Sequence, residues 1–105
     1  MEYRVEVSER AARDIEEAFE YIRLRAPENA WRWRRRLEQR LQVLITSPEA
    51  FGFAPEDTEA KAEIRQVLFG KYRILYTVRR QTVFILTVRH GARLFLSGGE
   101  IDAMQ

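Results

Sequence analysis

The stretch EIRQVLFGKYRILYTVRRQTVFILTVRHGAR, residues 63–93, decides the fold of this chain. β-Branched, aromatic and leucine residues fill it in three runs of strand length, at 62–69, 71–79 and 82–89. Two short breaks separate the runs, Phe69-Gly70-Lys71 and Arg79-Arg80-Gln81. Apolar runs of this length joined by short breaks are typical of antiparallel strands. We therefore predict a three-stranded antiparallel meander.

The turn between the last two strands sets which side chains share a face. A turn centred on Arg80-Gln81 places Val78 opposite Val83. Continuing without a shift gives the further pairs Tyr76 with Ile85, Ile74 with Thr87, and Tyr72 with Arg89. Directly opposed residues share a face, so one face is nearly all apolar and needs a core. A three-residue loop is the alternative, and it would move one strand's side chains to the other face.

The second face of the meander is apolar in the middle and basic at one end. Leu75, Phe84 and Leu86 form its centre, and Arg73 lies towards the basic end. An apolar surface of this kind is typical of a site that a partner covers. We therefore predict that these three apolar residues bind a protein partner. The alternative is that the segment 94–96 folds back over them.

The residues before the meander predict one strand and two helices. Residues 3–7 alternate apolar and charged side chains, as a half-buried strand does. Ser8 is the predicted N-cap of a first helix, which Pro27 ends. Asn29 is the predicted cap of a second helix over residues 30–46. The short connection between the helices indicates an antiparallel hairpin.

This order of elements predicts an α+β fold of two layers. An antiparallel sheet forms one layer, and the helical hairpin packs on one of its faces. The first strand joins the sheet, because a lone strand cannot satisfy its backbone. We expect one domain over residues 1–96, with residues 47–61 as a long loop. Residues 97–105 are predicted to be a flexible tail.

Composition limits the classes of function. The chain has 105 residues and no cysteine, so disulfide and thiolate chemistry are excluded. It shows no secretory signal and no apolar stretch of membrane-spanning length, which favours a cytoplasmic protein without membrane contact. Arginine supplies nearly all the basic side chains and clusters at 32–40 and 73–93. Arginine suits phosphate and carboxylate, so nucleic acid and an acidic protein are both candidate partners.

Beyond these properties, ordered motifs resemble the RelE/ParE superfamily of toxins from type II toxin–antitoxin systems. The motifs are SERAARDIEEAFEYI at 8–22, SPEAFG at 47–52, IRQVLFGKYRILYTV at 64–78 and VFILTVRHGAR at 83–93. Within them, the residues that match the family's glycine, tyrosine-arginine, tyrosine pattern are Gly70, Tyr72, Arg73 and Tyr76. Val88-Arg89-His90 is similar to the hydrophobic-x-His ending common in the ParE-like branch. The resemblance covers residues 3–96.

The resemblance implies a toxin that a wrapping antitoxin neutralises. ParE-like members are described as inhibitors of DNA gyrase, and RelE-like members as metal-independent endoribonucleases that cut mRNA on the ribosome. RelE-like members carry a tyrosine near the C terminus, whereas the last tyrosine here is Tyr76. We therefore expect a ParE-like gyrase inhibitor that inhibits growth and serves plasmid stabilization. A RelE-like ribosome-dependent endoribonuclease and a non-toxic binding relative are the alternatives.

Two sets of candidate site residues follow. In the endoribonuclease alternative, Arg73, Arg89 or Arg93 would hold phosphate and His90 would move protons. In the opposite interpretation these four residues are structural or surface groups, and no residue is catalytic. No metal or cofactor is expected in either case.

The protein-binding prediction adds residues of the second helix. Trp31 lies off the apolar stripe of that helix, and a large aromatic is costly to leave in water. Arg35 lies in the arginine cluster, which could face a partner or simply be solvated. The predicted partner-binding set is Trp31, Arg35, Leu75, Phe84 and Leu86. The loop 47–61 could instead cover Trp31, and a homodimer or a toxin–antitoxin hetero-oligomer is compatible with the sequence.

Overall fold

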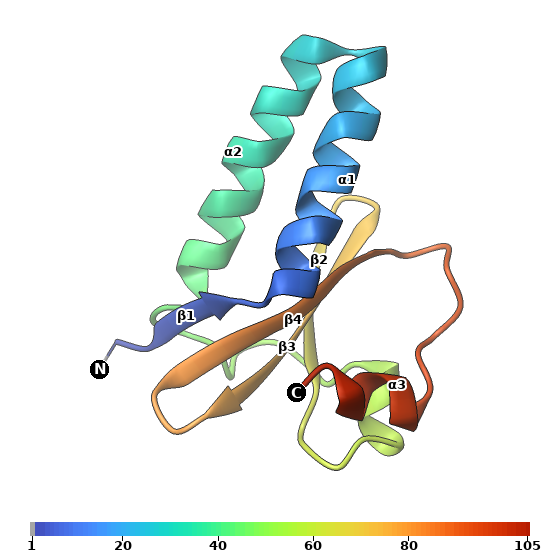
Figure 1. Ribbon diagram of the computed structural model, residues 1–105. Coiled ribbons are helices and arrows are strands. Elements are labelled where there is room, and N and C mark those ends of the chain that lie inside the picture. The colour runs from blue at the N-terminus through green and yellow to red at the C-terminus, as the bar shows by residue number, and fades with distance from the viewer. Residues whose placement is uncertain (1) are drawn as a thin grey trace.

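A four-stranded sheet in the order β1-β4-β3-β2 forms the centre of the fold (Figure 1). The computed structural model describes residues 2–105. The strands are β1 (Arg4–Val7), β2 (Arg65–Phe69), β3 (Tyr72–Arg79) and β4 (Thr82–His90). The predicted α+β fold is confirmed, and β2, β3 and β4 form the antiparallel meander. β1 joins the sheet as expected but runs parallel to β4, so the sheet is mixed.

The register of the β3–β4 hairpin follows the prediction only near its turn. Val78 lies opposite Val83 across a two-residue turn, where Arg80 has a φ of 57°. Such left-handed residues are typical of two-residue hairpin turns. A β-bulge between Leu75 and Tyr76 then shifts the pairing by one residue. The pairs beyond it are therefore Ile74 with Val88 and Tyr72 with His90, which corrects the predicted partners Thr87 and Arg89.

A carboxylate from the first helix accepts hydrogen bonds from two residues next to the β-bulge. Asp14 accepts hydrogen bonds from the Thr87 hydroxyl and, at 3.1 Å, from the Val88 amide. A bulge disrupts the regular ladder locally, and a buried amide needs a partner. The helix therefore stabilises the shifted register, which no local sequence pattern predicts.

The two helices form the predicted antiparallel hairpin, with different boundaries for the second. Helix α1 (Glu9–Arg25) begins after Ser8, whose hydroxyl accepts from the Ala11 amide at 3.0 Å, as predicted. Helix α2 (Pro27–Val43) begins at Pro27 and has no side-chain cap, so Asn29 is not its N-cap. Proline suits the first helical position, because no hydrogen bond is required of its nitrogen there.

The helical hairpin and one face of the sheet enclose the first core. Its buried residues are Ala11, Leu37, Leu44, Val67, Ile74, Tyr76, Val83, Ile85 and Val88. The Tyr76 hydroxyl donates to the Pro48 carbonyl inside the protein. Burial raises the pKa of Tyr76 to about 12, with a partial offset from Arg65. The predicted apolar face therefore packs as expected.

The chain itself covers the second face of the sheet. Leu75 and Leu86 are buried in a second core with Ala54, Ile64, Leu96 and Ile101. Ile101 belongs to a short helix, α3 (Gly98–Ala103), which a Ser97–Glu100 capping box begins. Residues 97–105, predicted to be a flexible tail, therefore contain a helix, which buries Ile101 against the second face of the sheet. Leu75 and Leu86 are accordingly buried by the chain itself. Of the segment 94–96 in the alternative, Leu96 packs here, whereas Leu94 and Phe95 stay exposed.

Glutamate side chains of the loop before β2 hold this C-terminal segment in place. Glu56 lies in the short helix η1 (Pro55–Thr58). Glu56 accepts from the Leu96 amide at 3.1 Å, and Glu59 accepts from the Gly98 amide at 3.2 Å. A side chain at Gly98 would approach the Glu59 carbonyl to 2.4 Å. The long loop is thus ordered by contacts that are remote in the sequence.

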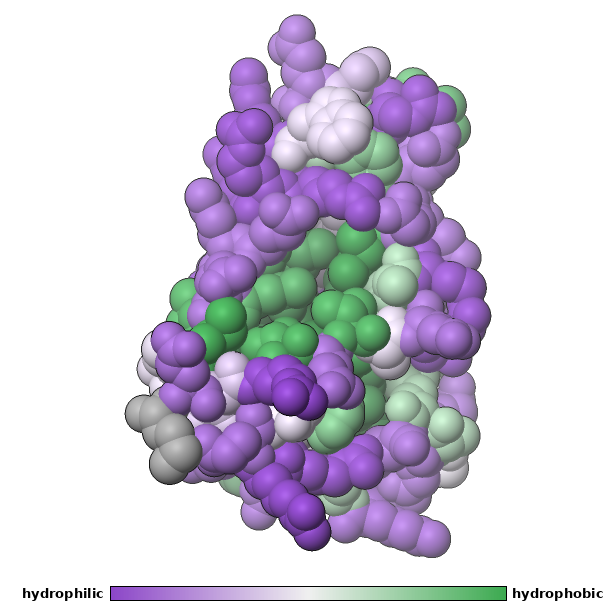
Figure 2. Space-filling view, turned by 60° about the vertical axis from the view of Figure 1, so that its left-hand side comes forward, coloured by the Kyte–Doolittle hydropathy of each residue, from purple (hydrophilic) through white to green (hydrophobic). Residues whose placement is uncertain are grey.

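One side of the molecule keeps hydrophobic side chains partly exposed. Figure 2 shows strongly hydrophobic side chains gathered in a hollow with a hydrophilic rim. This view brings forward the side of the molecule that carries α2 and β1 (Figure 1). The hydrophobic residues of these two elements that keep some exposure include Val5, Val7, Leu41 and Val43.

Candidate functional site

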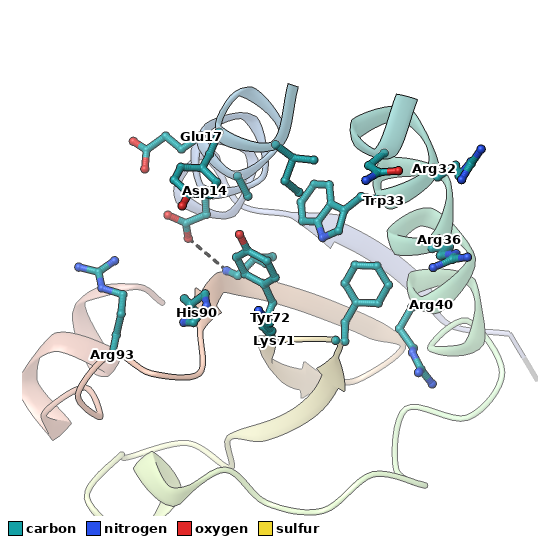
Figure 3. Close-up of a pocket in the computed structure, with 17 residues that line it drawn as sticks. Asp14, Glu17, Arg32, Trp33, Arg36, Arg40, Lys71, Tyr72, His90 and Arg93 are labelled. Carbon is teal, nitrogen blue, oxygen red and sulfur yellow. Dashed lines mark hydrogen bonds between the residues drawn. The ribbon is translucent and has the colours of Figure 1, made fainter. Parts of the chain in front are cut away.

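A groove of about 960 Å³ lies between the helical hairpin and the β2–β3 turn (Figure 3). α1 supplies Asp14 and Glu17 to one wall, and α2 supplies the opposite wall. Phe69 and the turn residues Gly70 and Lys71 close one end. The end of β4 and the residues after it bring in the groove's remaining polar side chains, His90 and Arg93.

Aromatic side chains form the floor of the groove. Trp33 packs on Tyr72 and Phe69, with ring centroids 5.5 and 5.9 Å apart. Tyr72 in turn meets the ring of His90 edge-on at 5.4 Å. Burial and the neighbouring Tyr21 raise the pKa of Tyr72, so its phenol is neutral at physiological pH. The floor is therefore an uncharged, half-buried platform.

Positive charge dominates the rim of the groove. Arg32, Arg36 and Arg40 follow one another along α2 at intervals of about one turn. Lys71 and Arg93 add two further cations, against two carboxylates on the α1 wall. Within residues 2–105, none of these five cations belongs to an ion pair. The groove thus combines free positive charge with an apolar floor, which suits an anionic ligand that also has apolar parts.

Arg73 lies outside this groove, on the second face of the sheet. It is only 5% exposed and donates to the Glu56 carboxylate and, at 2.9 Å, to Gln66. Burial alone would raise the pKa of Glu56, but hydrogen bonds from Arg73 and the Leu96 amide outweigh it and lower the pKa. Arg73, which would hold phosphate in the endoribonuclease alternative, is therefore engaged in a buried ion pair with Glu56.

Residues 5–95 match the family model described as the ParE toxin of the type II toxin–antitoxin system parDE. The chain belongs to the ParE toxin family. Membership in the ParE family confirms the resemblance that the sequence motifs indicate, including its ParE-like branch.

A solved structure has the same ParE fold. It is described as the chromosomal ParDE TA system from P. aeruginosa and has a TM-score of 0.71. The two chains are 14% identical, and the match covers 84% of this chain and 95% of the other. At this identity the match establishes the fold alone. None of the curated proteins matches the sequence.

The other candidate residues for RNA cleavage in this ParE-family chain are divided between two places. Arg89 donates twice to the Leu94 carbonyl, at 3.1 and 2.8 Å. Burial and the charge of Arg93 lower the pKa of Arg89. His90 accepts the Ala92 amide at Nδ1, 3.1 Å away, and lines the groove together with Arg93. The structure therefore places His90 and Arg93 at the groove, whereas Arg73 and Arg89 are directly opposed across β3 and β4.

The predicted partner-binding residues also lie at different places in the structure. Trp31 is 62% exposed and packs edge-on against Phe19 with centroids 5.0 Å apart, so the loop 47–61 does not bury it. Arg35 is exposed, and neither Trp31 nor Arg35 lines the groove. Phe84 is half-buried beneath Arg79, whose guanidinium carbon lies 4.9 Å from the ring centroid.

The sequence pattern predicts that the aromatic residues of the groove floor lie in the core. Trp33 lies on the apolar stripe of α2, so its spacing indicates burial alone. The sequence feature that could have indicated the groove is the spacing of Arg32, Arg36 and Arg40. This spacing places three cations along the helix beside the apolar stripe. In the part of the chain that the structure describes, no cluster of three or more candidate metal ligands occurs, and no helix meets the length and hydropathy needed to span a membrane.

Proposed function

We propose that this protein is a ParE-like toxin that acts in the cytoplasm by binding and inhibiting DNA gyrase. A cognate antitoxin neutralises it, and growth inhibition and plasmid stabilization follow from this pairing. Family membership supports the toxin and antitoxin assignments. The engagement of Arg73 within the protein supports binding over RNA cleavage.

The argument from Arg73 is electrostatic. Cleavage through a 2′-hydroxyl requires cations that are free to stabilise charge developing on the phosphate. Arg73 donates its hydrogen bonds to Glu56 and Gln66, and Arg89 donates to a backbone carbonyl. Moving Arg73 to a phosphate would leave the buried carboxylate of Glu56 without its partner, which is costly. A toxin that works through surface contacts avoids that cost.

The antitoxin binds the helical hairpin and the β1 edge of the sheet in this proposal. The hollow in Figure 2 lies on the side that carries α2 and β1. Val7 and Val43, one from each of these elements, are 43% and 42% exposed. Apolar residues that stay exposed on one side of a protein favour a protein contact there. The other face of the sheet is already occupied by Leu96 and Ile101.

Two parallel assays on the purified protein test this function. We expect it to inhibit DNA supercoiling by gyrase, and we expect the antitoxin encoded beside its gene to reverse the inhibition. In the second assay, ribosomes translating a defined mRNA should yield intact transcripts. Transcript cleavage that disappears in His90→Ala, together with normal gyrase activity, would establish the endoribonuclease instead. No effect in either assay, with antitoxin binding retained, would indicate a non-toxic relative.

A further inference from the structure

We infer that two copies of this chain associate edge to edge through strand β1, so that the sheet of one copy continues into the other. β1 lies at one end of the sheet (Figure 1), and within residues 2–105 the only strand that pairs with it is β4. The second copy runs antiparallel, related by a twofold axis through Val5. The inference goes beyond the proposed function, because it concerns the toxin alone and does not depend on gyrase being the target.

The outer edge of β1 offers backbone groups to a second strand. The amides of Arg4 and Ser8 donate inward, to carbonyls of the neighbouring β3–β4 hairpin, at 2.7 and 3.1 Å. Successive backbone groups of a strand point to opposite edges, so Tyr3, Val5 and Val7 direct theirs outward. The Tyr3 amide confirms this direction, since it donates to a carbonyl in the turn after α2 at 2.6 Å. The groups of Val5 and Val7 face the same edge, and such an edge is a template for another chain.

The sequence of β1 is complementary to itself in the antiparallel register centred on Val5. In that register Val5 lies opposite Val5 of the second copy, and the two residues exchange amide-to-carbonyl hydrogen bonds. Arg4 lies opposite Glu6 of the second copy, and the twofold axis repeats this contact on the other side. Tyr3 lies opposite Val7. Opposite charges directly across two strands attract each other, so both charge contacts are satisfied at once.

The neighbouring registers are disfavoured by the same charges. A twofold axis through Glu6 would place two glutamates directly opposite each other, and an axis through Arg4 would do the same with two arginines. Like charges directly opposite across strands are destabilising. Both side chains can reach a second copy, because they are 75% and 49% exposed and their contact within the chain is a loose 3.7 Å. The charges therefore select one register.

Pairing at this edge also covers apolar side chains. Tyr3 and Val5 are only partly buried against the first core, and Val7 is 43% exposed. Directly opposed residues share a face, so Val7 of each copy would pack beside Tyr3 of the other. Removing this apolar surface from water favours association.

The first measurement asks whether the edge is paired. It uses the purified toxin without its antitoxin, because the proposed antitoxin contact includes the same edge. We expect sedimentation equilibrium to show a dimer that forms as the concentration rises. We also expect hydrogen exchange of the Val5 amide to slow as the dimer forms, because pairing gives that amide a backbone acceptor.

Charge variants then test the register. In Arg4→Glu the glutamate at position 4 faces Glu6 of the second copy, and in Glu6→Arg the arginine at position 6 faces Arg4. We expect each variant alone to dimerise about tenfold more weakly than wild type. An equimolar mixture should regain the affinity as heterodimers, because every facing pair is again of opposite charge. Positions 4 and 6 within each chain keep like charges in the mixture, so the gain reports pairing between chains.

A second pair of variants is the matched control. Arg35→Glu and Glu38→Arg make the same charge changes at exposed positions of α2, away from β1. Their mixture should associate no more tightly than wild type. Circular dichroism and thermal unfolding of all four variants check that the fold is unchanged.

Three results would overturn the inference. The first is a monomer at every concentration. The second is a mixture of Arg4→Glu and Glu6→Arg that associates no better than either variant alone, which would place any dimer on another surface. The third is an equal gain in the control mixture, which would mean attraction by overall charge. None of these measurements involves gyrase, so a failure here leaves the supercoiling result to be judged separately.

Discussion

Arg73 and Glu56 form an ion pair in which the guanidinium group of one donates two hydrogen bonds to the carboxylate of the other. Their side chains are 6% and 0% exposed, so water solvates neither charge effectively. The pair joins strand β3 to the loop before β2, and Glu56 also accepts the Leu96 amide. It therefore connects three segments that are distant in the sequence.

The first prediction concerns removal of the arginine. Arg73→Ala leaves the Glu56 carboxylate buried without its counter-charge, and breaking such a pair costs about 3–5 kcal/mol. We expect a loss of that size in the free energy of unfolding, measured by chemical denaturation. Arg79→Ala on the same strand is the control, because Arg79 is exposed and should change stability by less than about 0.5 kcal/mol. A stable Arg73→Ala variant would mean that Arg73 is available for other roles.

The second prediction concerns acid. The pKa of Glu56 is lowered in the folded protein, below its ordinary value of 4.5. The carboxylate therefore contributes stability above its unfolded pKa, and this stability is lost as the pH falls through the lower, folded pKa. We expect Glu56→Gln to be less stable than wild type at neutral pH and to have a flatter stability profile below about pH 4.5. Glu63→Gln, at an exposed position, is the control and should change the free energy of unfolding at neutral pH by less than about 0.5 kcal/mol.

The third prediction concerns the second core. Leu86 and Ile101 are buried together, so truncating either to alanine should cost about 2–5 kcal/mol of unfolding free energy. Leu94→Ala is the control because Leu94 is 86% exposed. If Leu86→Ala keeps full stability but loses antitoxin binding, then the face opens to a partner and the covering helix α3 is displaced.

The fourth prediction concerns the β-bulge. Asp14→Ala removes the acceptor of the Thr87 hydroxyl and the Val88 amide, and leaving such groups unpaired costs about 1–3 kcal/mol. We expect faster amide hydrogen exchange at Val88 as well as lower stability. Glu17→Ala, one turn along α1 on the exposed wall, should preserve both quantities. Equal protection of Val88 in the two variants would show that the bulge does not need Asp14.

The fifth prediction concerns the antitoxin. Val7→Lys places a charge at the exposed β1 edge, and we expect it to weaken binding of the antitoxin encoded beside the gene by about tenfold or more. Leu68→Lys is the matched control, since Leu68 is an exposed apolar residue on β2, the opposite edge strand. Calorimetric titration measures both affinities. A larger loss in Leu68→Lys would place the antitoxin at the β2 edge.

The sequence alone predicted the helical hairpin, the meander and the two-residue turn after Arg79. These features depend on neighbours in the chain: the period of apolar residues, the hydroxyl of Ser8 before α1, and the length of the break between strands. The ordered motifs also carried the resemblance to the family, which the match over residues 5–95 confirms.

The tertiary structure decided which surfaces are open. The exposed face predicted for Leu75 and Leu86 is covered because Ile101, remote in the sequence, is buried against it. Arg73 is withdrawn from the surface by Glu56, and the register beyond the bulge follows the carboxylate of Asp14. Arg32, Arg36 and Arg40 of α2 line the same groove as the β2–β3 turn only because the helical hairpin packs on the sheet. Local periodicity fixes the elements, since it acts between adjacent residues, whereas burial and pairing between distant side chains are settled only when the layers pack.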